Sequence, residues 1–225
     1  MFNITNKPLL VLLGLPKTVW FNLRYLPWRQ AVRLPVWVSH RVWLLRMGGR
    51  VSVSEGVGFG RVQIGFSHVG VFDQVRCRSI WEVSGEVDFE GACGIAHGCK
   101  ISVTQEGHLI LGEGCSLNAE STIYCCQRVA IGAGAMVSWQ VQVMDSDLHK
   151  IMDAQTGRRL NADAPVSIGE RVWLGSRAMV CKGTRIAAGS IVAAGAVCSG
   201  ELGPENAIFA GVPARLLREG VVWER

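Results

Sequence analysis

Aliphatic residues recur at every sixth position over much of this chain. Between residues 168 and 192 the spacing is strict, with aliphatic side chains at Ile168, Leu174, Val180, Ile186 and Val192. An α-helix repeats every 3.6 residues and a simple strand every two, so neither explains such a pattern over a long stretch. A six-residue step fits a short strand followed by a corner, and three such sides close one triangular coil.

Small residues follow these aliphatic positions, as in Leu111-Gly112, Ile131-Gly132 and Leu174-Gly175. Glycine or alanine at such a position lets the backbone turn a corner without a Cβ clash. Stacked coils would bury a continuous aliphatic column, so each coil would depend on its neighbours for stability. The repeat therefore predicts a three-sided prism of short parallel strands.

This pattern resembles the hexapeptide-repeat acyltransferases, whose fold is an all-β, left-handed parallel β-helix. The resemblance covers roughly residues 60–215, and it implies a homotrimer that uses acetyl-coenzyme A as co-substrate. We expect the β-helix over residues 59–215, with an irregular loop over 146–165. A basic, tryptophan-rich segment with short helices is expected over 1–58, packed on the first coils, and a tail or short helix over 216–225.

The repeat is interrupted once, after Val143, by a long irregular segment that begins with Asp145, Asp147 and His149. An irregular segment of this length inside a compact domain is usually functional. Its Asp-x-Asp-x-His pattern resembles the motif of hexapeptide acyltransferases that acetylate sugars, in which the histidine is the general base. A neutral imidazole can accept the proton of a sugar hydroxyl, and a neighbouring carboxylate can fix its tautomer. The sequence leaves open which aspartate supplies that carboxylate.

A second motif, Val172-Trp173-Leu174-Gly175-Ser176, resembles the family segment that lies along the coenzyme A arm. The resemblance implies cofactor contacts from four residues at coil corners: Trp173, Gly175, Ser176 and Ala194. A backbone N–H of the Gly175–Ser176 pair is expected to hold the thioester oxygen as it gains negative charge.

Contacts to the cofactor's phosphates are expected from Lys182, Arg215 or Arg218, because basic side chains bind phosphate groups well. A lysine that several relatives carry near the end of the β-helix is absent from this chain. Asn118 resembles an asparagine that contacts the substrate in other sugar acetyltransferases.

The N-terminal part of the chain is strongly basic. Residues 1–54 contain eight lysines and arginines, no aspartate or glutamate, and four of the eight tryptophans. One interpretation is that residues 8–45 contact the inner face of a membrane, because basic side chains attract anionic headgroups and tryptophan prefers the interface. The other is that the tryptophans pack on the first coil and the arginines are solvated. Nucleic acid is not an expected partner, since no binding motif accompanies the charge.

Eight cysteines are spread through the glycine-rich sequence without a single Cys-x-x-Cys pair. We interpret them as reduced, packed thiols of a cytoplasmic protein. His97, His108 and His149 lack the spacing of metal ligands, so no metal site is expected. The sequence has neither a secretory signal pattern nor an apolar run long enough to span a bilayer.

Taken together, the resemblance implies an acetyl-coenzyme A-dependent O-acetyltransferase of a sugar hydroxyl in capsule, exopolysaccharide or lipopolysaccharide biosynthesis. The acceptor is expected to be a saccharide that can be lipid-linked, and it should attack the thioester directly. In the trimer, His149 of one subunit should face Trp173 and Ala194 of another. The alternatives are an amino-sugar N-acyltransferase, a serine acetyltransferase, or a non-catalytic β-helix scaffold.

Overall fold

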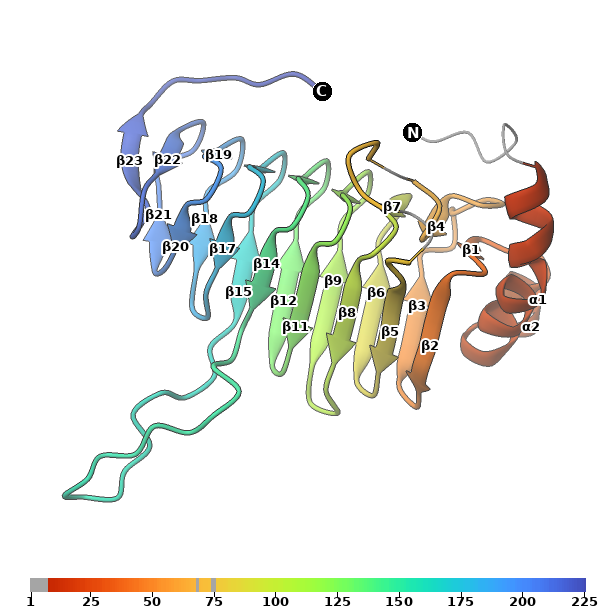
Figure 1. Ribbon diagram of the computed structural model, residues 1–225, viewed down its shortest axis with the longest axis horizontal. Coiled ribbons are helices and arrows are strands. Elements are labelled where there is room, and N and C mark those ends of the chain that lie inside the picture. The colour runs from red at the N-terminus through yellow and green to blue at the C-terminus, as the bar shows by residue number, and fades with distance from the viewer. Residues whose placement is uncertain (1–7, 68, 74–75) are drawn as a thin grey trace.

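The computed structural model describes residues 8–67, 69–73 and 76–225, and most of them form a three-sided prism of parallel strands (Figure 1). Successive strands fall on three sheets in turn, so each coil adds one strand to every sheet. Two helices close one end of the prism, and a long loop projects from one of its edges (Figure 1).

The strands are short, and strands that pair with each other come from neighbouring coils. Sheet 1 contains, in spatial order, β1 (Val36–Val38), β4 (Val62–Ile64), β7 (Cys93–Ile95), β10 (Ser116–Leu117), β13 (Met136–Val137), β16 (Trp173–Leu174), β19 (Ile191–Val192), β22 (Ile208–Ala210) and β23 (Arg215–Arg218). Sheet 2 contains β2 (Val42–Met47), β5 (Ser79–Val83), β8 (Lys100–Val103), β11 (Thr122–Cys125), β14 (Gln142–Met144), β17 (Met179–Val180) and β20 (Val197–Cys198). Sheet 3 contains β3 (Arg50–Val53), β6 (Glu86–Phe89), β9 (His108–Leu111), β12 (Arg128–Ile131), β15 (Val166–Ile168), β18 (Arg185–Ile186) and β21 (Glu201–Leu202).

The interior of the prism is a stack of aliphatic side chains. The residues of the strict repeat are at most 3% exposed: Ile168, Leu174, Val180, Ile186 and Val192. Each lies over its equivalent in the next coil, as Leu174 does over Val192. Full burial of one such side chain is worth about 1.5–3 kcal/mol, and it requires the coils above and below. The predicted left-handed parallel β-helix is confirmed.

At the corners between sheets 1 and 2, polar side chains stack into a ladder. Glu120, Gln140 and Arg177 have positive φ angles of 61°, 57° and 61°. Gln140 Nε2 donates to Glu120 Oε2 at 3.0 Å, and Arg177 Nε donates to Gln140 Oε1 at 2.9 Å. The hydrogen bond from Gln140 holds the pKa of the Glu120 carboxyl below its ordinary value. These bonds offset part of the strain that non-glycine residues have in the left-handed region.

The β-helix begins earlier than the sequence predicted. Strands β1, β2 and β3 already form one coil between Val36 and Val53, so the expected boundary between residues 58 and 59 is too late. Helices α1 (Pro8–Tyr25) and α2 (Trp28–Ala31) precede this coil. Residues 1–7 of the expected N-terminal segment lie outside the described residues. In the described part of the chain, no helix combines the length and the apolar character needed to cross a bilayer.

Helix α1 is fixed to strand β1 through polar side chains. Asn22 Nδ2 donates to the carbonyl of Val36 at 2.7 Å, and Asn22 Oδ1 accepts the Val36 N–H at 3.2 Å. Thr18 Oγ1 accepts the N–H of Val38 at 3.0 Å. Thr18 and Asn22 are both fully buried. Because β1 is the edge strand of sheet 1, these bonds satisfy backbone groups that the sheet itself leaves unpaired.

The C-terminal residues form a strand and an extended strap, not the helix that was one of the two expectations. Strand β23 pairs antiparallel with β22, so the neighbouring strand supplies hydrogen-bond partners for its backbone. The C-terminal strap, residues 219–225, then runs back over the prism (Figure 1). Trp223 Nε1 donates to the carbonyl of Arg171 at 2.7 Å. Arg225 donates to the carbonyl of Gly114 at 3.0 Å and to the hydroxyl of Ser116.

Candidate functional site

The projecting loop leaves the corner between sheets 2 and 3, and Asp145 fixes its first turn. The Asp145 side chain is fully buried. Its carboxylate accepts the backbone N–H groups of Cys126, Gln127 and Arg128 at 2.7, 2.7 and 2.8 Å. These three donors belong to the same corner one coil earlier. Asp145 therefore fastens the loop to the scaffold.

Asp147 and Asn161 close the base of the loop. Lys182 Nζ lies 2.6 Å from Asp147 Oδ2, and Asn161 Nδ2 donates to the same oxygen at 2.8 Å. These two hydrogen bonds, Lys182 first, hold the pKa of the Asp147 carboxyl below its ordinary value. Asn161 also donates to the carbonyl of His149 at 2.7 Å and accepts the N–H of Ile151 at 2.6 Å. The backbone around His149 is thus tied to the opposite strand of the loop.

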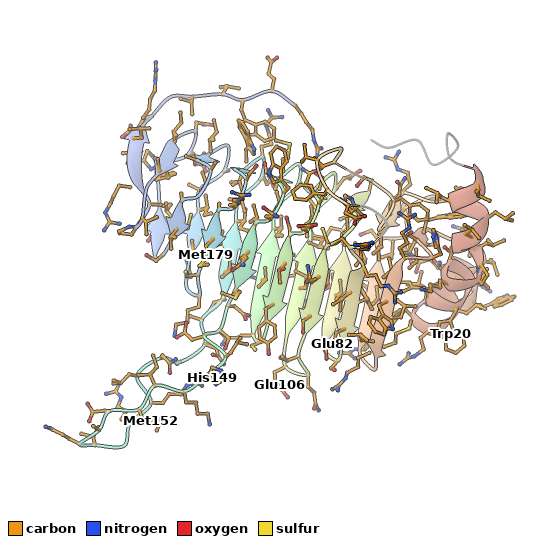
Figure 2. All side chains as sticks on the ribbon, in the orientation of Figure 1. Trp20, Glu82, Glu106, His149, Met152 and Met179 are labelled. Carbon is orange, nitrogen blue, oxygen red and sulfur yellow. The ribbon has the colours of Figure 1, made fainter. Side chains whose placement is uncertain are left out.

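The His149 side chain is exposed at the base of the loop (Figure 2). Among the described residues, no hydrogen-bond partner is found for its imidazole. The sequence predicted an aspartate as that partner. Within one chain the carboxylate of Asp145 is occupied by backbone N–H groups and that of Asp147 by Lys182 and Asn161. Both aspartates position the loop instead.

A groove of about 400 Å³ lies at a different place, along sheet 1 and its corner with sheet 2. Its walls are mostly apolar, with small residues where the backbone turns. They are formed by Val69, Asn118, Met136, Ser138, Trp139, Trp173, Gly175, Ser176, Ile191, Val192, Ala193 and Ala194. Five residues that the sequence singled out therefore lie together: Asn118, Trp173, Gly175, Ser176 and Ala194.

Several backbone N–H groups that line this groove, that of Trp139 among them, have no acceptor among the described residues. The N–H of Gly175 is not one of them, because it donates to the carbonyl of Val192 at 2.7 Å. In the described part of the chain, the N–H groups of Ser176 and Ala194 have no acceptor. Of the Gly175–Ser176 pair, only Ser176 therefore has an N–H available for the thioester oxygen. The N–H of Ala194 is a second candidate donor.

The basic residues expected near the cofactor do not line the groove. Lys182 lies at the corner between sheets 2 and 3, where it binds Asp147 and the carbonyl of Ala162. Arg215 and Arg218 lie on β23 and are exposed. Arg215 donates to the carbonyl of Ala214 at 3.1 Å. Gly175 and Ser176 follow β16, whereas Lys182 follows β17. Lys182 therefore lies at the next corner of the coil, away from the groove.

Several groove residues escaped the sequence analysis. The indole N–H of Trp173 donates to the hydroxyl of Ser138 at 3.0 Å, and its ring lies 6.0 Å from that of Trp223 in the C-terminal strap. The stacking of Val137 on Leu174 places Ser138 beside Gly175. Ser138 directly follows Val137, an aliphatic residue of the repeat, and this position was the signal for it. The long loop between Val143 and Val166 hides from the sequence that Ser138 corresponds to Gly175 in the next coil.

A second cavity, of about 360 Å³, adjoins the groove on sheet 1. Asn118 and Met136 line both hollows. Arg61 and Arg225 add positive charge to the second cavity, and Gln63 and Ser116 add hydrogen-bonding groups. The two hollows form one surface along sheet 1, partly roofed by the C-terminal strap.

His149 and the groove lie on different corners of the prism. The loop joins β14 to β15, whereas Gly175 and Ser176 join β16 to β17. Figure 2 shows His149 at the edge from which the loop projects. A single chain therefore does not bring the imidazole to the groove. Within the described residues, no group of three or more histidine, cysteine or acidic side chains could hold a metal ion.

Comparison with known proteins gives consistent matches. The family model described as bacterial transferase hexapeptide (six repeats) matches residues 165–200. A 24.8 kDa protein of the cps region of Klebsiella pneumoniae is 30% identical over 163 residues, which cover 72% of this chain and 70% of that protein. The putative lipopolysaccharide biosynthesis O-acetyltransferase WbbJ of Escherichia coli K12 is 29% identical over 140 residues, covering 57% of this chain and 71% of WbbJ.

Among solved structures, the polysialic acid-specific acetyltransferase NeuO aligns with a TM-score of 0.59. The alignment covers 82% of this chain and 72% of that one, at 21% sequence identity. At this identity the likeness shows a shared fold.

Proposed function

This chain belongs to the hexapeptide-repeat acyltransferases, and from that premise we propose that it transfers an acetyl group from acetyl-coenzyme A to a sugar hydroxyl. The choice of a sugar acceptor is supported by the relative WbbJ, which is named as a putative lipopolysaccharide biosynthesis O-acetyltransferase. The observation that carries the proposal is the exposed, unpartnered imidazole of His149 on a loop that Asp145 and Asn161 hold in place.

His149 acts as the general base. Its neutral imidazole accepts the proton of the acceptor hydroxyl while the hydroxyl oxygen attacks the thioester carbon. The N–H groups of Ser176 and Ala194 donate hydrogen bonds to the carbonyl oxygen as it becomes negative. When the bond from carbon to sulfur breaks, the imidazolium gives the proton to the leaving thiolate, which departs as the free thiol of coenzyme A.

No acyl-enzyme is part of this scheme. Burial raises the pKa values of Cys99, Cys125 and Cys198 to about 12, and a thiol with a raised pKa supplies little thiolate for attack. The groove fits the pantetheine arm of coenzyme A because its walls are apolar and its corners small, with backbone N–H groups left free at Ser176 and Ala194.

The active unit is a homotrimer in which neighbouring chains share each site. Within one chain, His149 and the groove lie on different corners, so the base and the thioester meet only if the loop of one subunit reaches the groove of another. A cyclic trimer repeats this contact three times with one type of interface.

The test is a thiol-release assay with acetyl-coenzyme A and a panel of sugars, amino sugars and serine. His149→Ala should lower kcat/KM with a sugar acceptor by about 10²–10⁴-fold. The matched control is His108→Ala, because His108 is also a surface histidine but bonds Asp88 on sheet 3 at 2.6 Å. Unchanged turnover in His149→Ala would refute the base assignment. Release of thiol only with amino acceptors would indicate an N-acyltransferase, and release with none a scaffold.

A further inference from the structure

Helix α1 buries the polar residues Thr18 and Asn22 beside Phe21, and it exposes most of its apolar residues. Its inner face holds Thr18 and Asn22, both fully buried against β1. Its outer face carries Leu12 and Trp20, which are 65% and 60% exposed. A surface helix of a globular protein normally keeps most of its apolar residues on the face that packs against the core. The outer face of α1 is therefore built for contact with something other than this chain.

The apolar surface extends beyond α1 over α2 and the first coil. We call this surface the end face and define it by its exposed apolar side chains: Leu9, Leu12, Leu13, Leu15, Val19, Trp20, Leu23, Trp28, Val32, Trp43 and Leu45. Trp20 marks it at the helical end of the molecule in Figure 2. Exposed apolar side chains in this number on neighbouring elements indicate an interaction site.

The tryptophans of this region separate two explanations. Trp37 packs in the core, 3% exposed, with its ring 5.3 Å from that of Phe59. Trp20, Trp28 and Trp43 are each more than half exposed. Packing on the first coil thus accounts for Trp37 alone. Three indoles remain on the end face, where an amphipathic ring suits the boundary between lipid and water.

The elements that carry the end face also carry exposed arginines. These are Arg24, Arg29, Arg33 and Arg46, and the guanidinium of Arg78 lies 5.4 Å from the ring centre of Trp43. No acidic residue precedes Glu55 in the sequence. Anionic headgroups attract such side chains. A second copy of the chain would instead bring two positive rims together.

We propose that the end face docks on an anionic membrane surface. Helix α1 lies in the interfacial plane with Leu12 and Trp20 inserted among the headgroups, and the arginines contact the lipid phosphates. The prism then stands out from the membrane on its helical end, with its coils and the His149 loop in water. This inference does not depend on the proposed chemistry, because binding can be measured without turnover.

Flotation of the full chain with phosphatidylcholine vesicles, with and without phosphatidylglycerol, tests the proposal. The chain should float only with the anionic vesicles, and less at high salt. Leu12→Gln combined with Trp20→Gln should lower the partition coefficient about tenfold or more. The matched control is Leu217→Gln, because Leu217 is 70% exposed at the other end of the prism. It should float like the wild type.

Separate variants test the charge and guard against misfolding. Arg29→Gln and Arg33→Gln should each weaken binding about fivefold, whereas Arg185→Gln on sheet 3 should not. Trp28→Gln, on α2, repeats the apolar test without altering α1. The proposal would be overturned if the wild type did not float with anionic vesicles. It would also be overturned if Leu12→Gln/Trp20→Gln and Trp28→Gln both floated as well as the wild type. Sedimentation showing that the end face joins two copies, with association lost in Leu12→Gln/Trp20→Gln, would overturn it as well.

Discussion

Asp145 and Asp147 are two positions apart in the motif but have different partners. The Asp145 carboxylate is buried and accepts three backbone N–H groups. In Asp145→Asn, the side-chain NH₂ would face one of these donors and leave it unpaired. We expect the free energy of unfolding to fall by about 2–4 kcal/mol, as measured by urea denaturation.

Asp147→Asn provides the comparison. Asp147 is partly exposed, and an exposed ion pair such as that with Lys182 contributes about 1 kcal/mol or less. This variant should unfold almost like the wild type but turn over more slowly, because the base of the loop is loosened. If Asp145→Asn were as stable as Asp147→Asn, Asp145 would not be the structural anchor.

The ion pair between Lys182 and Asp147 predicts how the loop responds to pH. The folded-state pKa of Asp147 is lowered, first by Lys182 and then by Asn161. Stabilisation by a carboxyl of this kind is fully present above its ordinary pKa of about 4 and is lost as the pH falls through the lowered value. The Ile151 N–H, bonded to Asn161 at 2.6 Å, should thus stay protected from exchange at about pH 5 and lose protection only below about pH 4.

Lys182→Met removes the cation, so protection of the Ile151 amide should already be reduced at about pH 5. Lys150→Met is the control, because Lys150 lies in the same loop and is exposed without an ion-pair partner among the described residues. Equal protection in the wild type and in Lys182→Met would show that the pair does not order the loop.

At the scale of elements, the sequence predicted the later coils best. Strands β15 to β19 follow the strict repeat, because each side is one inward aliphatic residue and one tight corner. The first coil was missed because β2 and β3 are longer and turn through Gly48-Gly49 without an aliphatic residue before a small one. Strand β23 gave no signal, since its four residues are exposed and pair antiparallel outside the stack.

The site was predictable to the extent that it follows the repeat. Trp173, Gly175 and Ala194 sit at the corners of regular coils, and the structure brings them into one groove. Asn161 could not be found from the sequence, because its bonds to Asp147 and His149 depend on how an irregular loop folds back on itself. The six-residue repeat does not extend into this loop, so it gives no spacing from which these hydrogen-bond partners could be predicted.

Gly175 shows how tightly the corners are built. A Cβ on Gly175 would lie 2.6 Å from the N atom of Ala194 and 2.7 Å from the carbonyl oxygen of Val192. Since both atoms belong to the backbone of the next coil, neither can rotate away. Gly175→Ala should therefore lower the free energy of unfolding by about 2–4 kcal/mol.

Gly94→Ala is the matched control on the same sheet. A Cβ on Gly94 would meet nothing within 4 Å, and the residue has no positive φ. Alanine there should leave stability unchanged or raise it by up to about 1 kcal/mol, by restricting the unfolded chain. Thermal melts of the two variants side by side decide the matter. Similar melting temperatures would contradict the close packing of the corner.

For the molecule as a whole, three surfaces of the prism have distinct characters. Sheet 3 carries a surface ion pair between Arg50 and Glu86 and a hydrogen bond between His108 and Asp88, which suits contact with water. Sheet 1 is apolar and hollowed by the groove. The helical end exposes leucines and tryptophans. In the proposed mechanism the groove and the base His149 lie on different corners, so one chain alone does not complete a site.

Mixed trimers test that division of labour. His149→Ala subunits retain an intact groove, and Trp173→Ala subunits retain an intact loop. Each homotrimer should be nearly inactive, because each of its sites lacks one part. If the two variants are co-expressed with different tags and purified through both, only mixed trimers remain, and about a third of their sites have an intact loop beside an intact groove. Thiol release should recover to about that fraction of the wild-type rate.

The control is a mixture of His149→Ala with His149→Gln, in which every loop is defective and no assortment restores a site. Recovery in the first mixture and none in the second is expected if sites are shared. If neither mixture recovers although tagged trimers form, the imidazole must serve the groove of its own chain. The loop would then have to fold across sheet 2 to reach it, a distortion that the anchoring of Asp145 and Asn161 opposes.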